Sequence, residues 1–137
     1  MVNIGNISDV IIRQYPHWLY KRTDTESVQD DNGSWTDSGE PIIELCGACR
    51  EETNGKGSRI QAADGEFIEF SSLVLMPVGV QRITEGTTIF VTEEEITDPA
   101  QLLDSTFVEQ AKAEGIIRIT GECLKFDGGR LHHRMWI

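Results

Sequence analysis

The chain of 137 residues is long enough for one hydrophobic core and too short for two. Hydrophobic residues make up 39% of it and charged residues 26%, which excludes wholesale disorder and fibrous folds. With 23 acidic against 12 basic residues, the formal charge of -11 argues against nucleic-acid binding through a basic patch. We expect one domain over residues 1–137, with no membrane span and no signal peptide, made in the cytoplasm.

The first third of the chain predicts one strand and one acidic loop. Pro16 interrupts an apolar stretch, and a strand is expected over residues 18–22. Residues 24–40 hold six acidic residues, no basic residue and several turn formers, including Asn32 and Gly33. This pattern indicates an exposed loop or an open hairpin arm. Because long loops in compact domains are functional or disordered, we expect it to dock on assembly.

The middle of the chain reads as strands separated by glycine-containing turns. Strands are expected over residues 41–53, 58–62, 67–77 and 87–92. The turn formers stand at residues 54–57, at Asp64-Gly65 and at Glu85-Gly86. In the stretch 67–77 the apolar side chains at even positions indicate one core-facing side.

One helix and a closing hairpin complete the prediction. Asp98 caps the helix, Pro99 takes its first position and Gly115 ends it. A hairpin follows, with strands over residues 116–126 and 130–137, and a bulge or bend at Gly121 where the apolar alternation changes parity. The expected fold is therefore mainly β: a small antiparallel β-barrel or sandwich with one α-helix before a C-terminal β-hairpin, and a long acidic loop near the N-terminus.

Three cysteines raise the question of metal or thiol chemistry. Cys46 and Cys49 have CxxC spacing, but their flanks look extended, whereas redox pairs open a helix that lowers the thiol pKa. A structural zinc site would need Cys123 with His132 or His133 from the far hairpin. Since the two histidines are consecutive, they should point to opposite faces of their strand. We interpret the cysteine pair as small strand residues and expect no cofactor, with a metal- or thiol-binding β domain as an alternative.

Other signatures of chemistry are missing from the sequence. The acidic loop does not fit a calcium-binding EF-hand, because Val28 and Gly39 fall where carboxylates are required. No phosphate-binding glycine loop, GxSxG elbow or HExxH helix occurs, so we do not expect an enzyme. A further alternative is a ligand-binding β-barrel with a cavity lined by Phe70, Val74 and Phe90.

Four segments follow one another in a familiar order: residues 71–77 (SSLVLMP), 85–91 (EGTTIFV), 117–122 (IRITGE) and 134–137 (RMWI). This order resembles the small head–tail connector (head closure or stopper) proteins of tailed bacteriophages, and residues 49–55 (CREETNG) are similar to prophage versions. The resemblance covers residues 42–137 and does not extend to the acidic loop.

The resemblance implies a β-barrel protomer that forms a homo-oligomeric ring beneath the portal, closes the DNA-filled head and docks the tail. The implied partners are further copies of the chain, portal or adaptor proteins and tail proteins, with DNA passing through the lumen without specific binding. The implied location is the head–tail interface of the virion.

Charge is distributed unevenly along the chain, which favours such an assembly. Residues 115–137 hold four Lys or Arg against two acidic residues, the reverse of the acidic loop. Opposite patches on one protomer favour head-to-tail contacts, and these close into a ring where the rotation allows. Tryptophan and arginine dominate interface energetics. The expected interface residues are Asp30, Asp31, Trp35, Arg130, Arg134 and Trp136.

Overall fold

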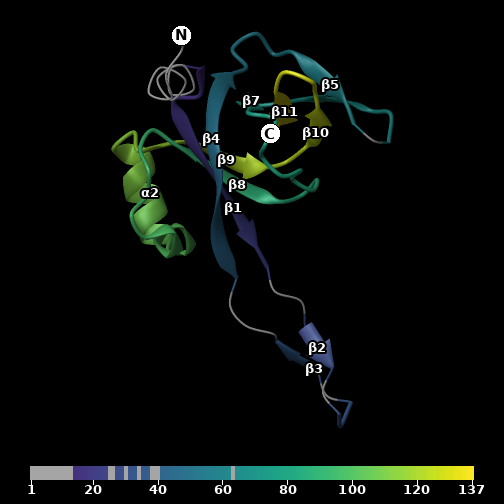
Figure 1. Cartoon of the computed structure of the whole chain (residues 1–137), viewed down its shortest axis with the longest axis vertical. Coiled ribbons are helices and arrows are strands. Elements are labelled where there is room, and N and C mark those ends of the chain that lie inside the picture. The colour runs from purple at the N-terminus through teal and green to yellow at the C-terminus, as the bar shows by residue number, and fades with distance from the viewer. Residues whose placement is uncertain (1–13, 25–26, 30, 34, 38–40, 63) are drawn as a thin grey trace, which may run out of the picture.

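The computed structural model describes residues 14–24, 27–29, 31–33, 35–37, 41–62 and 64–137. The main sheet is antiparallel and seven-stranded, with the strand order β10-β11-β7-β4-β1-β8-β9. Its strands are β1 (His17–Thr23), β4 (Ile42–Thr53), β7 (Ser72–Met76), β8 (Thr88–Thr92), β9 (Ile117–Glu122), β10 (Lys125–Gly128) and β11 (His133–Trp136). The sheet curls into a half-barrel (Figure 1), which confirms the predicted mainly β fold.

The curl follows from the connection between the two outermost strands. β9 and β10 stand at opposite ends of the strand order, yet only Cys123 and Leu124 separate them. Such a link spans at most roughly 11 Å between flanking Cα atoms. The Cys123 N–H donates to the Thr87 carbonyl at 2.9 Å, and the Leu124 N–H donates to the Trp136 carbonyl at 2.7 Å. The link is therefore bonded to both ends of the sheet and holds them together.

This corner corrects the predicted strand over residues 116–126. The chain bends at Cys123 and Leu124, so β9 pairs with β8 and only β10 pairs with β11. The terminal hairpin itself is confirmed. The bulge expected at Gly121 is wrong, because Gly121 pairs regularly with Ile89; the register shift lies opposite Arg118, between Val91 and Thr92.

A second predicted strand, over residues 67–77, is also divided. β6 (Phe67–Glu69) pairs with β5 (Arg59–Gln61) in a separate hairpin, and β7 joins the main sheet. The break falls at Ser71, whose N–H donates to the Ile137 carbonyl and so brings the chain to the C-terminal strand. The predicted Asp64-Gly65 turn is confirmed, with Gly65 at φ 88.

The predicted helix is split by a second capping residue. Asp98 caps a 3-10 helix, η1 (Pro99–Leu103), and Asp104 caps α2 (Ser105–Ala113). The Asp104 side chain accepts a hydrogen bond from the Thr106 N–H at 2.9 Å, so the helix restarts there with a new N-terminus. Gly115 ends α2 at φ 78, as predicted.

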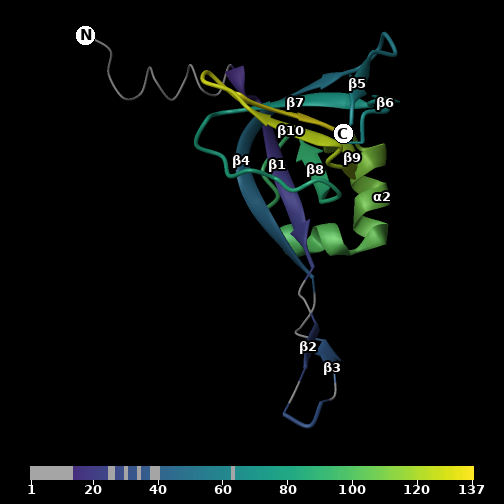
Figure 2. The same cartoon turned by 90° about the vertical axis from the view of Figure 1, so that its right-hand side faces the viewer.

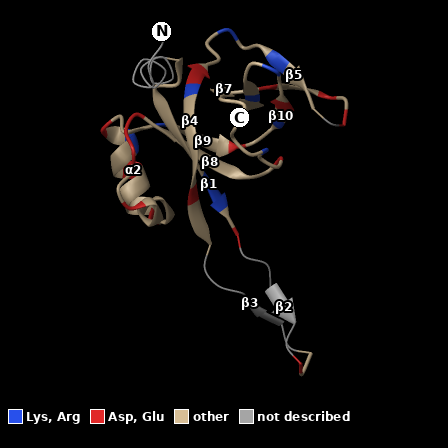
Figure 3. Cartoon of the chain, in the orientation of Figure 1, with Lys and Arg blue, Asp and Glu red and all other residues tan. Residues whose placement is uncertain are grey.

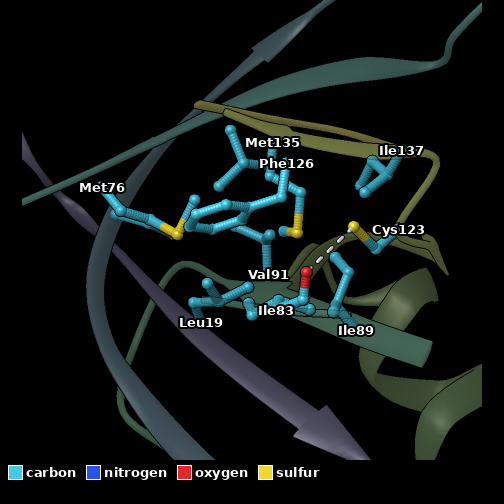
Figure 4. Packing of buried hydrophobic residues seen from close by; sticks show 11 residues of the cluster. Leu19, Met76, Ile83, Ile89, Val91, Cys123, Phe126, Met135 and Ile137 are labelled. Carbon is cyan, nitrogen blue, oxygen red and sulfur yellow. Dashed lines mark hydrogen bonds between the residues drawn. The ribbon is translucent and has the colours of Figure 1, made fainter. Parts of the chain in front are cut away.

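Two hydrophobic clusters cover opposite sides of the same strands. Leu19 points into the half-barrel and its neighbour Tyr20 points toward the helices, and both are fully buried. The Tyr20 hydroxyl accepts a hydrogen bond from the Ile96 N–H at 2.8 Å. Figure 4 shows the interior cluster, which we call the barrel core: Leu19, Cys49, Val74, Met76, Ile83, Ile89, Val91, Cys123, Phe126, Met135 and Ile137. The cluster beneath η1 and α2 comprises Tyr20, Phe90, Ile96, Leu102, Ala111 and Ile117.

The acidic segment forms a hairpin arm. β2 (Ser27–Gln29) and β3 (Trp35–Asp37) pair antiparallel as a sheet of their own, with Gly33 at φ 84 between them. Figures 1 and 2 show both strands well away from the half-barrel. We call residues 24–40 the acidic arm.

The pairing of β1 with β4 contains a β-bulge, where Leu19 is opposite Gly47 and Tyr20 is opposite Leu45. The backbone conformation of Gly47 at this bulge can be tested by substitution. Gly47 has φ 140, and a Cβ there would lie 3.4 Å from Val80 Cγ2. We expect Gly47→Ala to lower the free energy of unfolding in urea by about 1–3 kcal/mol, because other residues are strained at this φ. Gly79→Ala is the matched control, since Gly79 lies outside the left-handed region and its added Cβ has no described atom within 4 Å. Equal losses in both variants would contradict this account.

Candidate functional site

A buried carboxylate organises the polar interior at one end of the sheet. The Glu51 side chain is only 2% exposed. Its Oε1 accepts from Arg118 Nε at 3.1 Å and lies 3.0 Å from Arg118 Nη2, while its Oε2 accepts from Ser72 Oγ at 2.8 Å and Thr53 Oγ1 at 2.9 Å. A buried charge is tolerated when it is paired and hydrogen-bonded, and both conditions hold for Glu51.

His17 and Glu93 extend this network. The Glu51 backbone N–H donates to His17 Nδ1 at 3.0 Å, so the proton of the neutral ring sits on Nε2. Nε2 lies 3.8 Å from Glu93 Oε2, and Glu93 also pairs with Arg118. Burial, followed by the Arg118 charge, lowers the pKa of His17 against the opposing effect of the two carboxylates. The hydrogen bond to Glu93 is the main reason that the pKa of Arg118 is raised.

A β-bulge positions the arginine of this network. Val91 pairs with Ile119 and Thr92 with Ile117, which leaves Arg118 as the extra residue of β9. Bulges re-aim side chains, and here the guanidinium reaches Glu51 on β4, which is not a neighbour of β9 in the sheet. The ion pair therefore ties together strands that share no backbone hydrogen bonds.

The network contains a serine, a histidine and a carboxylate, but their arrangement is not that of a nucleophilic triad. The Ser72 hydroxyl donates to Glu51, and Ser72 is fully buried. The His17 Nδ1 is occupied by a backbone amide. A triad needs the base hydrogen-bonded to the hydroxyl and the nucleophile accessible to substrate. These contacts suit a network that holds strands together.

Removing the buried charge should therefore cost stability. We expect Glu51→Gln to lower the free energy of unfolding in urea by about 2–4 kcal/mol, because it leaves donors of the network without their charged acceptor. The control is Glu52→Gln, at a neighbouring exposed position paired with Arg50, with an expected loss of less than about 1 kcal/mol. A similar loss in both variants would contradict a special role of Glu51.

The lowered pKa of His17 predicts a pH dependence of folding. The unfolded chain takes up a proton on this residue below the ordinary pKa of 6.5, whereas the folded chain does so only at lower pH. Its contribution to stability is thus present above pH 6.5 and is lost as the pH falls through the folded value. In urea unfolding at a series of pH values, His17→Gln should show a shallower decline over this window than the wild type. Identical slopes would show that His17 does not carry the effect.

The three cysteines belong to the barrel core. Cys49 and Cys123 are buried in it and Cys46 packs against it. Residues three apart on a regular strand point to opposite faces, but Cys46 is the extra residue of the bulge between β1 and β4, and this restores a common side. Burial raises the pKa of Cys46 and of Cys123 to about 11, and raises that of Cys49 further. All three are therefore protonated thiols at neutral pH.

The structure does not gather these residues into a metal centre. Among the residues that it describes, no group of three His, Cys, Asp or Glu side chains is placed to hold a metal ion. His133 begins β11 and His132 immediately precedes it, and the two side chains contact different parts of the chain. His133 packs edge-on against Phe126, at 5.3 Å between ring centroids. His132 instead lines a surface cavity.

The outward side of β10 and β11 brings two predicted interface residues, Arg134 and Trp136, close together. The Trp136 ring centroid lies 5.4 Å from the Arg134 guanidinium carbon and 5.7 Å from Lys125 Nζ, within the range of cation–π contacts. Arg134 also pairs with Asp127, directly across the hairpin. Arg130 is exposed in the turn between the two strands.

The same side continues onto β7 and β4. Trp136 is opposite Leu73, and Arg134 is opposite Leu75. Leu75 in turn is opposite Arg50 on β4. We call this surface the outer face, and its residues are Arg50, Glu52, Leu73, Leu75, Lys125, Asp127, Arg134 and Trp136.

The predicted interface residues of the acidic arm lie elsewhere. Asp31 is exposed near the tip of the arm, whose red segment is visible in Figure 3. Asp30 lies outside the described residues, as does the side chain of Trp35, although its backbone belongs to β3. Within one chain the arm points away from β10 and β11 (Figure 2), so the two predicted patches do not meet.

Two features of the site were not expected from the sequence. One is the Glu51 network, whose members come from four distant strands and the segment after β8. The other is a cavity of about 440 Å³ beside the outer face, lined by Gln14, Tyr15, Arg50, Leu75, Leu131 and His132. The only sequence signal for the cavity was an apolar Leu131 in a polar turn, where it is 85% exposed.

The residues predicted to line a ligand cavity, Phe70, Val74 and Phe90, do not line a common cavity. Val74 belongs to the barrel core, whereas Phe90 packs under the helices.

Comparisons of the chain with models of known families, with curated proteins and with solved structures find no match. Within the described part of the chain, no helix has the length and apolar character needed to cross a membrane.

Proposed function

We propose that the chain is a structural subunit of a phage head–tail connector, which forms a ring, closes the DNA-filled head and docks the tail. The proposal starts from the resemblance of residues 42–137 to that family, whose implied protomer is a small β-barrel. A curled antiparallel sheet agrees with this expectation. On this proposal the working surfaces are protein–protein contacts, and no turnover is involved.

The observation that supports it best is the separation of two oppositely charged surfaces. The acidic arm projects from the body with six acidic residues and no basic residue in its sequence. The terminal hairpin, at the other end of the molecule, carries Lys125 and Arg134 against Trp136 and has Arg130 in its turn. Surfaces that cannot meet within one chain are suited to head-to-tail contacts between copies.

The total charge agrees with a subunit that lines a DNA channel. A net charge of -11 repels phosphates, so DNA would slide past such a ring without being retained. The buried thiols and the buried Ser72 favour this reading over chemistry at those groups.

Deletion of the gene from the phage genome that encodes it tests this proposal. We expect electron microscopy of the lysate to show DNA-packaged heads and free tails that do not join, with DNA lost from the heads. Supplying the wild-type chain from a plasmid should restore complete particles, and an empty plasmid is the control. Complete infectious particles in the deletion strain, or a block before DNA packaging, would overturn the assignment.

A further inference from the structure

The acidic arm contains a two-stranded hairpin that lies outside the main sheet. β2 and β3 form a sheet of only two strands, separate from the half-barrel. Two-stranded hairpins are at best marginally stable in water, and a third strand or a packing surface is needed to stabilise them. A highly acidic hairpin carries the added cost of repulsion among its carboxylates, which basic groups on a partner would relieve.

The outer face offers a surface of complementary character. Leu73, Leu75 and Trp136 are only partly buried and form an apolar centre. Arg50 and Arg134 are exposed beside it, each paired with a carboxylate of the same face, Glu52 and Asp127 respectively. An aromatic and aliphatic centre edged by arginines is the usual composition of a protein interface, and exposed apolar groups of this kind mark docking surfaces.

The cavity beside the outer face adds a site for a large side chain. Its volume of about 440 Å³ exceeds that of an indole ring, and Tyr15, Leu75 and Leu131 give it apolar walls. Leu131 is 85% exposed, which leaves a large apolar side chain in contact with water unless a partner covers it. The arm sequence contains one aromatic residue, Trp35.

We propose that the acidic arm of one copy docks on the outer face of the next copy, with Trp35 entering the cavity beside Leu131. In this contact Asp30 and Asp31 face Arg130 and Arg134. The occupant is a second copy of this chain, because the arm of the same chain points away from that face. The contact uses two different surfaces, so it repeats from copy to copy and closes a ring when the rotation permits.

The ion pair between Arg134 and Asp127 allows a role of Arg134 in the contact to be distinguished from a role in folding alone. Arg134 is already paired with Asp127 on the neighbouring strand, and this carboxylate competes with an incoming acidic arm. Asp127→Asn should therefore strengthen association by a fewfold, although it removes an ion pair from the folded chain. A residue that matters only for folding would weaken association when its ion pair is lost.

The test measures self-association of the full chain by sedimentation equilibrium up to about 1 mM at low salt. We expect a concentration-dependent rise in mass that is suppressed at about 500 mM NaCl, where exposed charges are screened. Arg134→Glu and Asp31→Lys should each weaken association at least about tenfold, and the double variant should restore much of it. Trp35→Ala should weaken it without changing the salt dependence.

The matched control is Lys112→Glu, which makes the same charge change on α2, away from β10 and β11 in Figure 1. It should leave association near the wild-type value. A wild-type chain that stays monomeric at about 1 mM, or an unchanged association constant in Arg134→Glu, would overturn the inference.

This inference rests on the proposed function, and the two fail separately. If the chain stays monomeric but deletion of its gene still leaves tails unjoined, only the arm contact is overturned. If the chain self-associates in a charge-dependent way but deletion of its gene leaves particles intact, only the connector assignment is overturned.

Discussion

The two-residue link between β9 and β10 is the constraint on which the rest of the structure depends. Because Cys123 and Leu124 join strands at opposite ends of the strand order, the sheet has to curl until those ends meet. The curl creates a concave side, and the side chains that point into it form the barrel core. Cys123 itself is buried there, with its Sγ 3.8 Å from the Ile83 carbonyl.

The polar network depends on the same curvature. Glu51 on β4 and Arg118 on β9 share no backbone pairing, yet their side chains are in direct contact. A bulge re-aims Arg118, while the bulge at Cys46 and Gly47 turns two cysteines to the same side. Both irregularities thus serve the curled sheet: one supplies an ion pair across it, and the other supplies packing within it.

The proposed contacts use surfaces of the chain that lie outside its two hydrophobic clusters. The concave side is filled by the barrel core, and η1 and α2 cover one part of the convex side. The outer face of β4, β7, β10 and β11 and the acidic arm lie outside both clusters. Their opposite charges and their separation within one molecule are the grounds for the proposed contact between copies.

The sequence by itself determined the strand-rich composition, the turns at Gly65 and Gly115, the capping role of Asp98 and the acidic character of the arm. These features are local, since each depends on φ preferences, capping or charge within a few residues. Only the tertiary structure decided where long apolar runs break, because runs such as 116–126 satisfy strand periodicity on both sides of a corner. It alone also assembled Glu51 with Arg118, 67 residues away, since pairing across a curled sheet leaves no trace in local spacing.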